Sequence, residues 1–319
     1  MEATTATNVL EQGEFADLRD AVRTEVSKVV IGHTDAVDLL LIAAIAGGHV
    51  LLEGPPGVAK TLLAGSLARA LGVQFTRIQF TPDTKPSDIS GESVVKMGEK
   101  VFVPGAVFTN VLLADEINRT PPRTQAALLE AMQEHHITAD GRIHWLPSPF
   151  VVIATQNPFE QEGVFPLPES QLDRFLFKIV VDYLSEDEEV DMLALPHCGV
   201  TPDMLEDVRP LLGVGLLHEL QQRIDATVVP ASVARYTVRL VRRTRALPGV
   251  VLGGSPRAAI HLLSAARANA SLAGRSEVSA ADVARMAPPV LTHRIIAEGQ
   301  SGHDVIAEAI AGVPAPVAE

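Results

Sequence analysis

Residues 49–61, HVLLEGPPGVAKT, constrain the fold more than any other part of this 319-residue chain. An apolar run predicts a buried strand, a loop rich in Gly and Pro follows, and Lys60 and Thr61 open a helix. A phosphate-binding loop needs this layout, because its backbone N–H groups face the phosphates, the Lys reaches the β/γ-phosphates and the Thr hydroxyl meets Mg²⁺. Ala59 stands where the usual pattern has its last Gly, so the segment alone leaves open a turn that binds nothing.

Two later apolar runs end in polar residues that suit the same chemistry. The run 110–114 ends in Asp115 and Glu116, and the run 150–154 is closed by a turn that contains Asn157. Beside a phosphate loop, Asp115 would hold Mg²⁺ through its water shell and Glu116 would polarise the attacking water. Asn157 would hold that water or the γ-phosphate. Surface acids and a simple Asn-Pro turn are the alternative interpretations.

Continuous apolar strands separated by helical stretches indicate a parallel sheet that is covered on both faces. The strands are expected at 50–52, 73–80, 110–114, 150–154 and 177–181. The segment 81–105 is too long and too rich in turn residues for a plain connection, so we interpret it as an insertion with a hairpin at 92–103. A second hairpin is expected at 137–146, with its turn at Asp140-Gly141.

The pattern changes near residue 184 to helices only, with Ser-x-x-Glu and Ser-x-x-Asp capping boxes that begin at Ser185 and Ser279. The expected organisation is therefore a flexible tail at 1–14, an α/β nucleotide-binding domain at 15–184 and a smaller helical domain at 185–319.

Charge and cysteine content narrow the class of protein further. The net charge of −13 disfavours a surface that binds duplex nucleic acid, although it leaves open a local basic pore. The single cysteine, Cys198, excludes an internal disulfide and fits a reducing compartment. Residues 1–14 lack a basic start and an apolar run, and the most apolar stretch, 39–52, is too short to span a bilayer. We therefore expect a cytoplasmic protein without a membrane segment.

Taken together, the motifs resemble those of the MoxR-type AAA+ ATPases. GPPGVAKT, LLADEINRTPPRTQAALLEAMQE, ATQNP, LPESQLDRF and GSPRA occur in that family's order, and the resemblance covers about residues 25–310. Ala before Lys60 is also usual in this family. The resemblance implies an AAA+ P-loop NTPase fold, with a parallel sheet flanked by helices and a smaller all-α lid domain after it.

The resemblance also assigns roles by motif position. Lys60 and Thr61 match the Walker A motif, Asp115 and Glu116 match Walker B, and Asn157 matches sensor 1. Arg174 falls where the family places an arginine finger that reaches the neighbouring subunit's γ-phosphate, and Arg257 resembles sensor 2. A surface ion pair and a solvated helix arginine remain the alternatives for these two arginines.

Three sets of site residues follow. The expected catalytic residues are Glu116, Asn157, Arg174 and Arg257. The residues expected to bind ATP, with the first two beside the adenine, are Ile31, Gly32, Gly54, Pro55, Pro56, Gly57, Val58, Ala59, Lys60, Thr61, Leu62 and Asp115. The expected Mg²⁺ ligands are Thr61 and, through water, Asp115.

The resemblance implies Mg²⁺-dependent ATP hydrolysis in an oligomeric ring, expected to be a hexamer. Hydrolysis would drive chaperone-like remodelling, maturation or metal insertion of a partner protein complex. Proteins with a von Willebrand factor A domain are among the expected partners. The insertion and the second hairpin would contact this client. The ATPase subunit of a metal chelatase is an alternative, and a nucleic-acid motor is a further one, which the acidic charge disfavours. A small-molecule kinase fits Glu116 and Arg174 less well.

Overall fold

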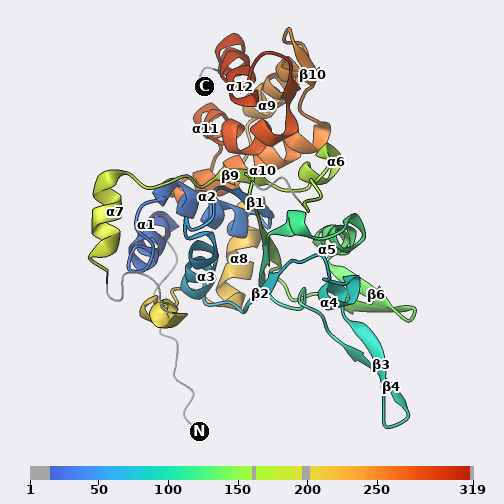
Figure 1. Ribbon diagram of the computed structural model, residues 1–319. Coiled ribbons are helices and arrows are strands. Elements are labelled where there is room, and N and C mark those ends of the chain that lie inside the picture. The colour runs from blue at the N-terminus through green and yellow to red at the C-terminus, as the bar shows by residue number, and fades with distance from the viewer. Residues whose placement is uncertain (1–14, 160–162, 196–201, 317–319) are drawn as a thin grey trace.

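The computed structural model describes residues 15–159, 163–195 and 202–316, so the predicted tail at 1–14 lies outside the described residues. Its centre is a five-stranded parallel sheet in the order β2-β5-β8-β1-β9 (Figure 1). These strands are β1 Val50–Glu53, β2 Phe75–Gln79, β5 Val111–Asp115, β8 Val151–Gln156 and β9 Phe177–Val180. The central strands are buried on both faces, which explains why they read as continuous apolar runs.

Helices cover both faces of this sheet. Successive residues of β1 point to opposite faces: Val50 and Leu52 pack into the larger hydrophobic core on one face, and Leu51 packs into the smaller core on the other. The helices of this part, with one 3-10 turn, are α1 Phe15–Val26, α2 Thr34–Ile45, α3 Lys60–Ala70, α4 Pro86–Ser90, η1 Ile117–Arg119, α5 Pro122–Glu134 and α6 Glu169–Leu172. The predicted α/β class with a parallel sheet flanked by helices is confirmed.

Two antiparallel hairpins extend from the sheet domain, on the side away from the C-terminal helices (Figure 1). They are β3 Glu92–Lys96 with β4 Glu99–Val103, and β6 His136–Ala139 with β7 Arg142–Trp145. Both predicted hairpins are thus confirmed. Lys100 of the first forms an ion pair with Asp140 of the second, and the rings of Phe102 and His144 stack with centroids 3.9 Å apart. The hairpins therefore support one another.

The C-terminal region is helical, as predicted, with one exception. Its elements are α7 Glu186–Leu193, η3 Pro202–Asp207, α8 Val214–Asp225, α9 Ala231–Thr244, β10 Val250–Leu252, α10 Pro256–Leu272, α11 Ala280–Leu291, η4 Thr292–Arg294, β11 Ile296–Ala297 and α12 Gly302–Gly312. The expectation of helices only was wrong for β10 and β11, which form a short antiparallel pair. Strands this short leave no periodic signal in the sequence.

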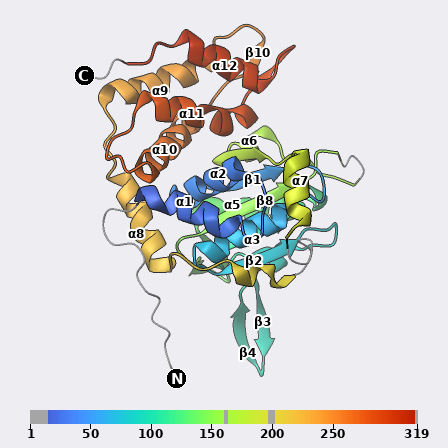
Figure 2. The same ribbon diagram turned by 90° about the vertical axis from the view of Figure 1, so that its left-hand side faces the viewer.

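Part of the C-terminal region packs directly against the sheet domain. Leu211 N–H donates to the carbonyl of Ala70 at 2.7 Å, and the Gln221 amide donates to the carbonyl of Ala44 at 2.8 Å. Residues 209–221 therefore lie against α2 and α3, whereas α9–α12 form a separate layer beyond the sheet domain (Figure 2). None of the helices in the described ranges is long and apolar enough to cross a bilayer.

The buried carboxylate of Asp282 fixes the start of α11. Burial alone would raise its pKa, but hydrogen bonds from Arg275 and Ser279 outweigh that effect and lower the pKa to about 2. Asn269 also donates to it, at 2.6 Å. A carboxylate with a depressed pKa stabilises the fold above its unfolded-state pKa, and this stabilisation disappears as the pH falls through the folded-state value.

We predict that Asp282→Asn lowers the free energy of unfolding by about 1–3 kcal/mol at pH 7, the cost of disturbing buried hydrogen bonds to a charge. The difference in unfolding free energy between the variant and the wild type should decrease as the pH falls from about 4 to 2, because the wild-type carboxylate is then protonated. Urea denaturation across this range measures it. Asp304→Asn is the matched control, since Asp304 makes the same capping box with Ser301 in an exposed position. An equal effect at both sites would contradict the assignment.

Candidate functional site

The loop between β1 and α3 has the backbone that a phosphate loop needs. A Cβ on Gly54 would lie 2.0 Å from the Val181 carbonyl oxygen, so only glycine permits this close approach to the end of β9. Gly57 has a φ of +86°. Ala59 is also left-handed, with φ 58° and ψ 23°, which costs a residue with a Cβ about 1–2 kcal/mol. The conformation explains why the general pattern has glycine there.

Lys60, the first residue of α3, is folded back against this loop. Its ammonium group donates to the carbonyl oxygens of Gly54 at 2.8 Å and Pro55 at 2.6 Å. Burial lowers the pKa of Lys60, while the negative charges of Asp115 and Glu116 oppose that shift. The lysine is thus held at the loop and faces the two carboxylates.

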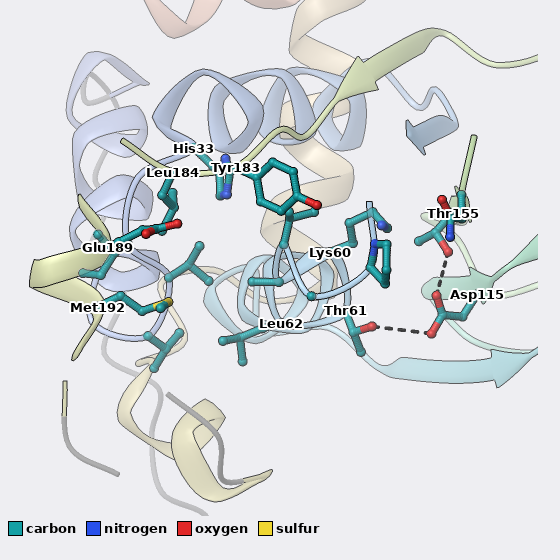
Figure 3. Close-up of a pocket in the computed structure, with 18 of the residues that line it drawn as sticks. His33, Lys60, Thr61, Leu62, Asp115, Thr155, Tyr183, Leu184, Glu189 and Met192 are labelled. Carbon is teal, nitrogen blue, oxygen red and sulfur yellow. Dashed lines mark hydrogen bonds between the residues drawn. The ribbon is translucent and has the colours of Figure 1, made fainter. Parts of the chain in front are cut away.

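Asp115 is buried at the carboxyl end of β5 and accepts hydrogen bonds from three sides. The Thr155 hydroxyl donates to Oδ1 at 2.6 Å, and the Thr61 hydroxyl lies 3.5 Å from Oδ2 (Figure 3). Arg77 donates to the same Oδ2 from Nε at 3.0 Å and from Nη2 at 2.7 Å. The carboxylate is therefore fixed in orientation.

Glu116 follows Asp115 in a left-handed conformation with a φ of 57°. Its backbone N–H donates to the Thr155 hydroxyl at 2.9 Å, so this one hydroxyl connects both carboxylate residues. The Glu116 side chain accepts from Gln79 at 2.8 Å and from Arg119 at 3.2 Å. Sequence reasoning missed Thr155 and Gln79, because their relevance depends on which strands are neighbours in the sheet.

Asn157 lies just beyond β8 and is 8% exposed. Its side-chain oxygen accepts the backbone N–H of Phe159 at 3.1 Å, which holds the amide group at the end of the strand. The predicted position beside Asp115 and Glu116 follows from the parallel pairing of β5 with β8.

A cavity of about 580 Å³ brings most of the predicted residues together. The predicted residues that line it are Ile31, Pro56, Gly57, Val58, Ala59, Lys60, Thr61, Leu62, Asp115, Glu116 and Asn157. Gly32, Gly54 and Pro55 do not line the cavity; Gly32 and Pro55 are next to lining residues in the chain, and Gly54 is one residue further away. The other end of the cavity is mostly apolar and is formed by Val29, Val30, His33, Tyr183, Leu184, Glu189, Met192 and Leu195 (Figure 3). Sequence reasoning missed this wall, because α7 reads as part of the helical domain.

The oxygen atoms at the polar end suit one kind of metal ion. No group of three or more His, Cys, Asp or Glu residues that could hold a metal exists among the described residues. A hard cation here would be held by the Thr61 hydroxyl, the Asp115 carboxylate, water and ligand phosphates. Mg²⁺ prefers such a set, since it keeps several waters and binds through one or two carboxylates plus phosphates.

Arg174 and Arg257 are placed together, but outside this cavity. They line a separate cleft of about 310 Å³ that shares no lining residue with the first. Arg174 donates to the Leu129 carbonyl at 3.0 Å, and burial, together with the charge of Arg257, lowers its pKa. The cleft is thus a positively charged surface, and neither arginine reaches the phosphate loop of its own chain.

Comparisons with known proteins agree with this geometry. The chain matches the family model described as "ATPase family associated with various cellular activities (AAA)" at residues 49–177, and the AAA lid domain at 242–310. It is 44% identical over 283 residues to the chaperone MoxR1 of Mycobacterium tuberculosis, covering 85% of this chain and 74% of the relative. Protein MoxR of Paracoccus denitrificans is 36% identical, with 88% of each chain covered.

Two further comparisons span nearly the whole chain. The uncharacterized protein YeaC of Bacillus subtilis is 43% identical over 300 residues, covering 92% of this chain and 93% of the relative. The crystal structure of a putative ATPase from Cytophaga hutchinsonii superposes with a TM-score of 0.87 at 36% identity, covering 95% of this chain and 96% of that one.

We predict that Thr155→Val lowers the free energy of unfolding by about 1–3 kcal/mol, because it leaves the buried Asp115 oxygen and the Glu116 N–H without their shared partner. Valine has nearly the same shape, so packing is preserved. Thr155→Ser keeps the hydroxyl and is the matched control. Chemical denaturation of both variants measures the difference, and equal stabilities would show that the bridge contributes little.

Proposed function

The chain belongs to the MoxR family of AAA+ ATPases, and we propose that it uses Mg²⁺-dependent ATP hydrolysis to remodel a partner protein. One observation carries the proposal: the phosphate loop, two carboxylates and an amide line a single cavity that is polar at one end and apolar at the other. The polar end suits a triphosphate with its cation. The apolar end, between Ile31 and Met192, suits an adenine ring.

The proposed roles at the polar end follow from position and charge. Backbone N–H groups of the loop and of the α3 N-terminus bind the phosphates, and Lys60 turns from the loop carbonyls toward the β/γ-phosphates. Thr61 and Asp115, the latter through water, would hold Mg²⁺, and the bound ion would supply neutralisation of charge on the β/γ-oxygens. Glu116 polarises the attacking water, and Asn157 fixes that water beside the γ-phosphate.

The arginine cleft supports a site that is shared between two copies of the chain. Arg174 and Arg257 are absent from the cavity of their own chain, yet both are charged and face an open cleft. We infer a head-to-tail assembly in which this cleft meets the next copy's cavity; such a heterologous contact forms a ring when its rotation closes. A hexamer, as the family resemblance implies, would place ATP at every interface, where the arginines neutralise charge in the transition state.

The hairpins are the proposed surface for the client. Several large apolar side chains on the hairpins are exposed, namely Val95, Met97, Ile143 and Trp145. Such a group of exposed apolar side chains is unusual on a surface that contacts only water. The name of the Mycobacterium tuberculosis relative, a chaperone, agrees with protein remodelling. We propose that the chain acts in the cytoplasm on a partner protein complex, which it matures or loads with metal, and that a protein of this complex has a von Willebrand factor A domain.

We predict that Glu116→Gln keeps ATP binding and lowers turnover by about 10²–10⁴-fold, the usual contribution of a positioned general base. Lys60→Ala should instead weaken ATP binding itself, since it removes the charge that faces the phosphates. Binding of a fluorescent ATP analogue and phosphate release separate the two effects. Arg239→Ala, on the exposed face of α9, is the control for loss of a positive charge. Normal turnover in Glu116→Gln would exclude the proposed role.

We predict that Arg174→Ala lowers turnover by about 10³–10⁵-fold, as loss of an arginine finger does in related hydrolases. Mixing it with Lys60→Ala subunits should restore part of the activity, because some interfaces then combine an intact cavity with an intact Arg174. The measurement is ATP turnover against mixing ratio, with native mass spectrometry to show that mixed assemblies form. Mixed assemblies without any recovery would contradict a role in trans.

A further inference from the structure

Arg294 is a charged side chain buried at the junction between the helical lid and the sheet domain. Only 2% of its side chain is exposed, and burial lowers its pKa to about 10 despite the opposing effect of Asp173. The guanidinium donates to the Asp173 carboxylate at 2.8 Å and to the Asp173 carbonyl at 3.1 Å. It also donates to the carbonyls of Phe175 and Leu176. One lid residue therefore holds the whole segment 173–176.

Asp173 receives two more groups from the lid. The Ser255 hydroxyl, which caps α10, lies 3.2 Å from each carboxylate oxygen, and Arg257 Nη1 lies 3.8 Å from Oδ2. Three lid side chains from two separate elements thus converge on one carboxylate. A half-buried carboxylate with this many partners has a strongly restrained geometry.

The position of Asp173 in the chain gives this junction a consequence for the arginine cleft. Asp173 directly precedes Arg174, and Ser255 lies two residues before Arg257. Arg174 belongs to the sheet domain and Arg257 to the lid, yet they line the same cleft. The relative placement of the two arginines therefore depends on the contacts made by the carboxylate between them.

We propose that Asp173 is a positioning residue that holds Arg174 and Arg257 as one unit for insertion into a neighbouring copy's ATP site. The proposal rests on the function proposed above. Asp173 itself does not line the cavity of its own chain. Its effect is on the geometry of the two arginines, where small displacements of groups that stabilise a transition state are costly.

Attachment of the lid does not depend on this carboxylate alone. Arg294 keeps its carbonyl partners when Asp173 is neutralised, His293 lies 3.2 Å from the Phe175 carbonyl oxygen, and the larger apolar core extends through both parts. Asp173→Asn removes the charge while it keeps the size of the side chain. The variant therefore tests positioning rather than folding.

The first test compares kcat, KM and binding. Asp173→Asn should lower kcat by at least about tenfold, while KM and ATP-analogue binding stay unchanged. A loss of this size corresponds to part of the transition-state stabilisation that an arginine finger provides. Asp173→Glu retains the charge and should recover part of kcat. Asp225→Asn, at the exposed end of α8, is the matched control. An unchanged kcat in Asp173→Asn, or a change confined to KM, would overturn the proposal.

The second test uses mixed assemblies. Asp173→Asn with Lys60→Ala should regain activity, since the first supplies an intact cavity and the second an intact pair of arginines. Asp173→Asn with Arg174→Ala should regain none, because both lack a working pair. Recovery in this second mixture would overturn the proposal, as would loss of assembly in Asp173→Asn by native mass spectrometry, which indicates a merely structural role. If wild type neither binds nor hydrolyses ATP, the proposed function itself fails.

Discussion

The site depends on one feature of the sheet: β8 lies between β1 and β5. Neighbouring strands are about 4.8 Å apart, so the phosphate loop after β1 and the carboxylates after β5 are separated by about 10 Å. That gap accommodates phosphates and a hydrated cation. The end of β8 supplies Thr155 and Asn157 to this gap, and the Thr155 hydroxyl bonds both the Asp115 carboxylate and the Glu116 N–H on its β5 side. Strand order thus determines both the width of the site and the orientation of its acids.

Opposite charges balance each other around this gap. Asp115 is paired with Arg77, and Glu116 accepts hydrogen bonds from Gln79 and Arg119. These partners hold two adjacent carboxylates in fixed orientations beside the cavity. Arg77 and Gln79 lie on β2, which pairs with β5 in the sheet, and Arg119 lies on η1, which follows β5 in the chain. The acidic end of the cavity is therefore arranged by its own sheet domain before any ligand contributes.

Several parts of the fold could be predicted from the sequence because their signals are local. The phosphate loop is marked by its Gly and Pro residues, and the two hairpins are marked by turns that contain Gly98 and Asp140-Gly141. Asp115 and Asn157 mark the ends of two strands. Strand order and register are not local, so the partners Arg77, Gln79 and Thr155 could not be found. The same limit hid α7, whose helical pattern says nothing of its place at the cavity. The sequence around Arg294 does not distinguish it from an exposed arginine at a helix end, because its burial depends on contacts with the distant segment 173–176.

The cavity and the arginine cleft share no residue, and this separation has a mechanical consequence. α7 forms a wall of the cavity, so a nucleotide that presses on this wall acts on the segment that leads from the sheet domain into the helical region. The lid at the other end of that region is fixed to segment 173–176 through Arg294. In the head-to-tail assembly proposed above, events at a chain's own cavity would therefore change how its arginines meet the next chain. Coupling between two sites is a free energy that acts in both directions, and in that assembly the junction at Asp173 would form part of the connection between them.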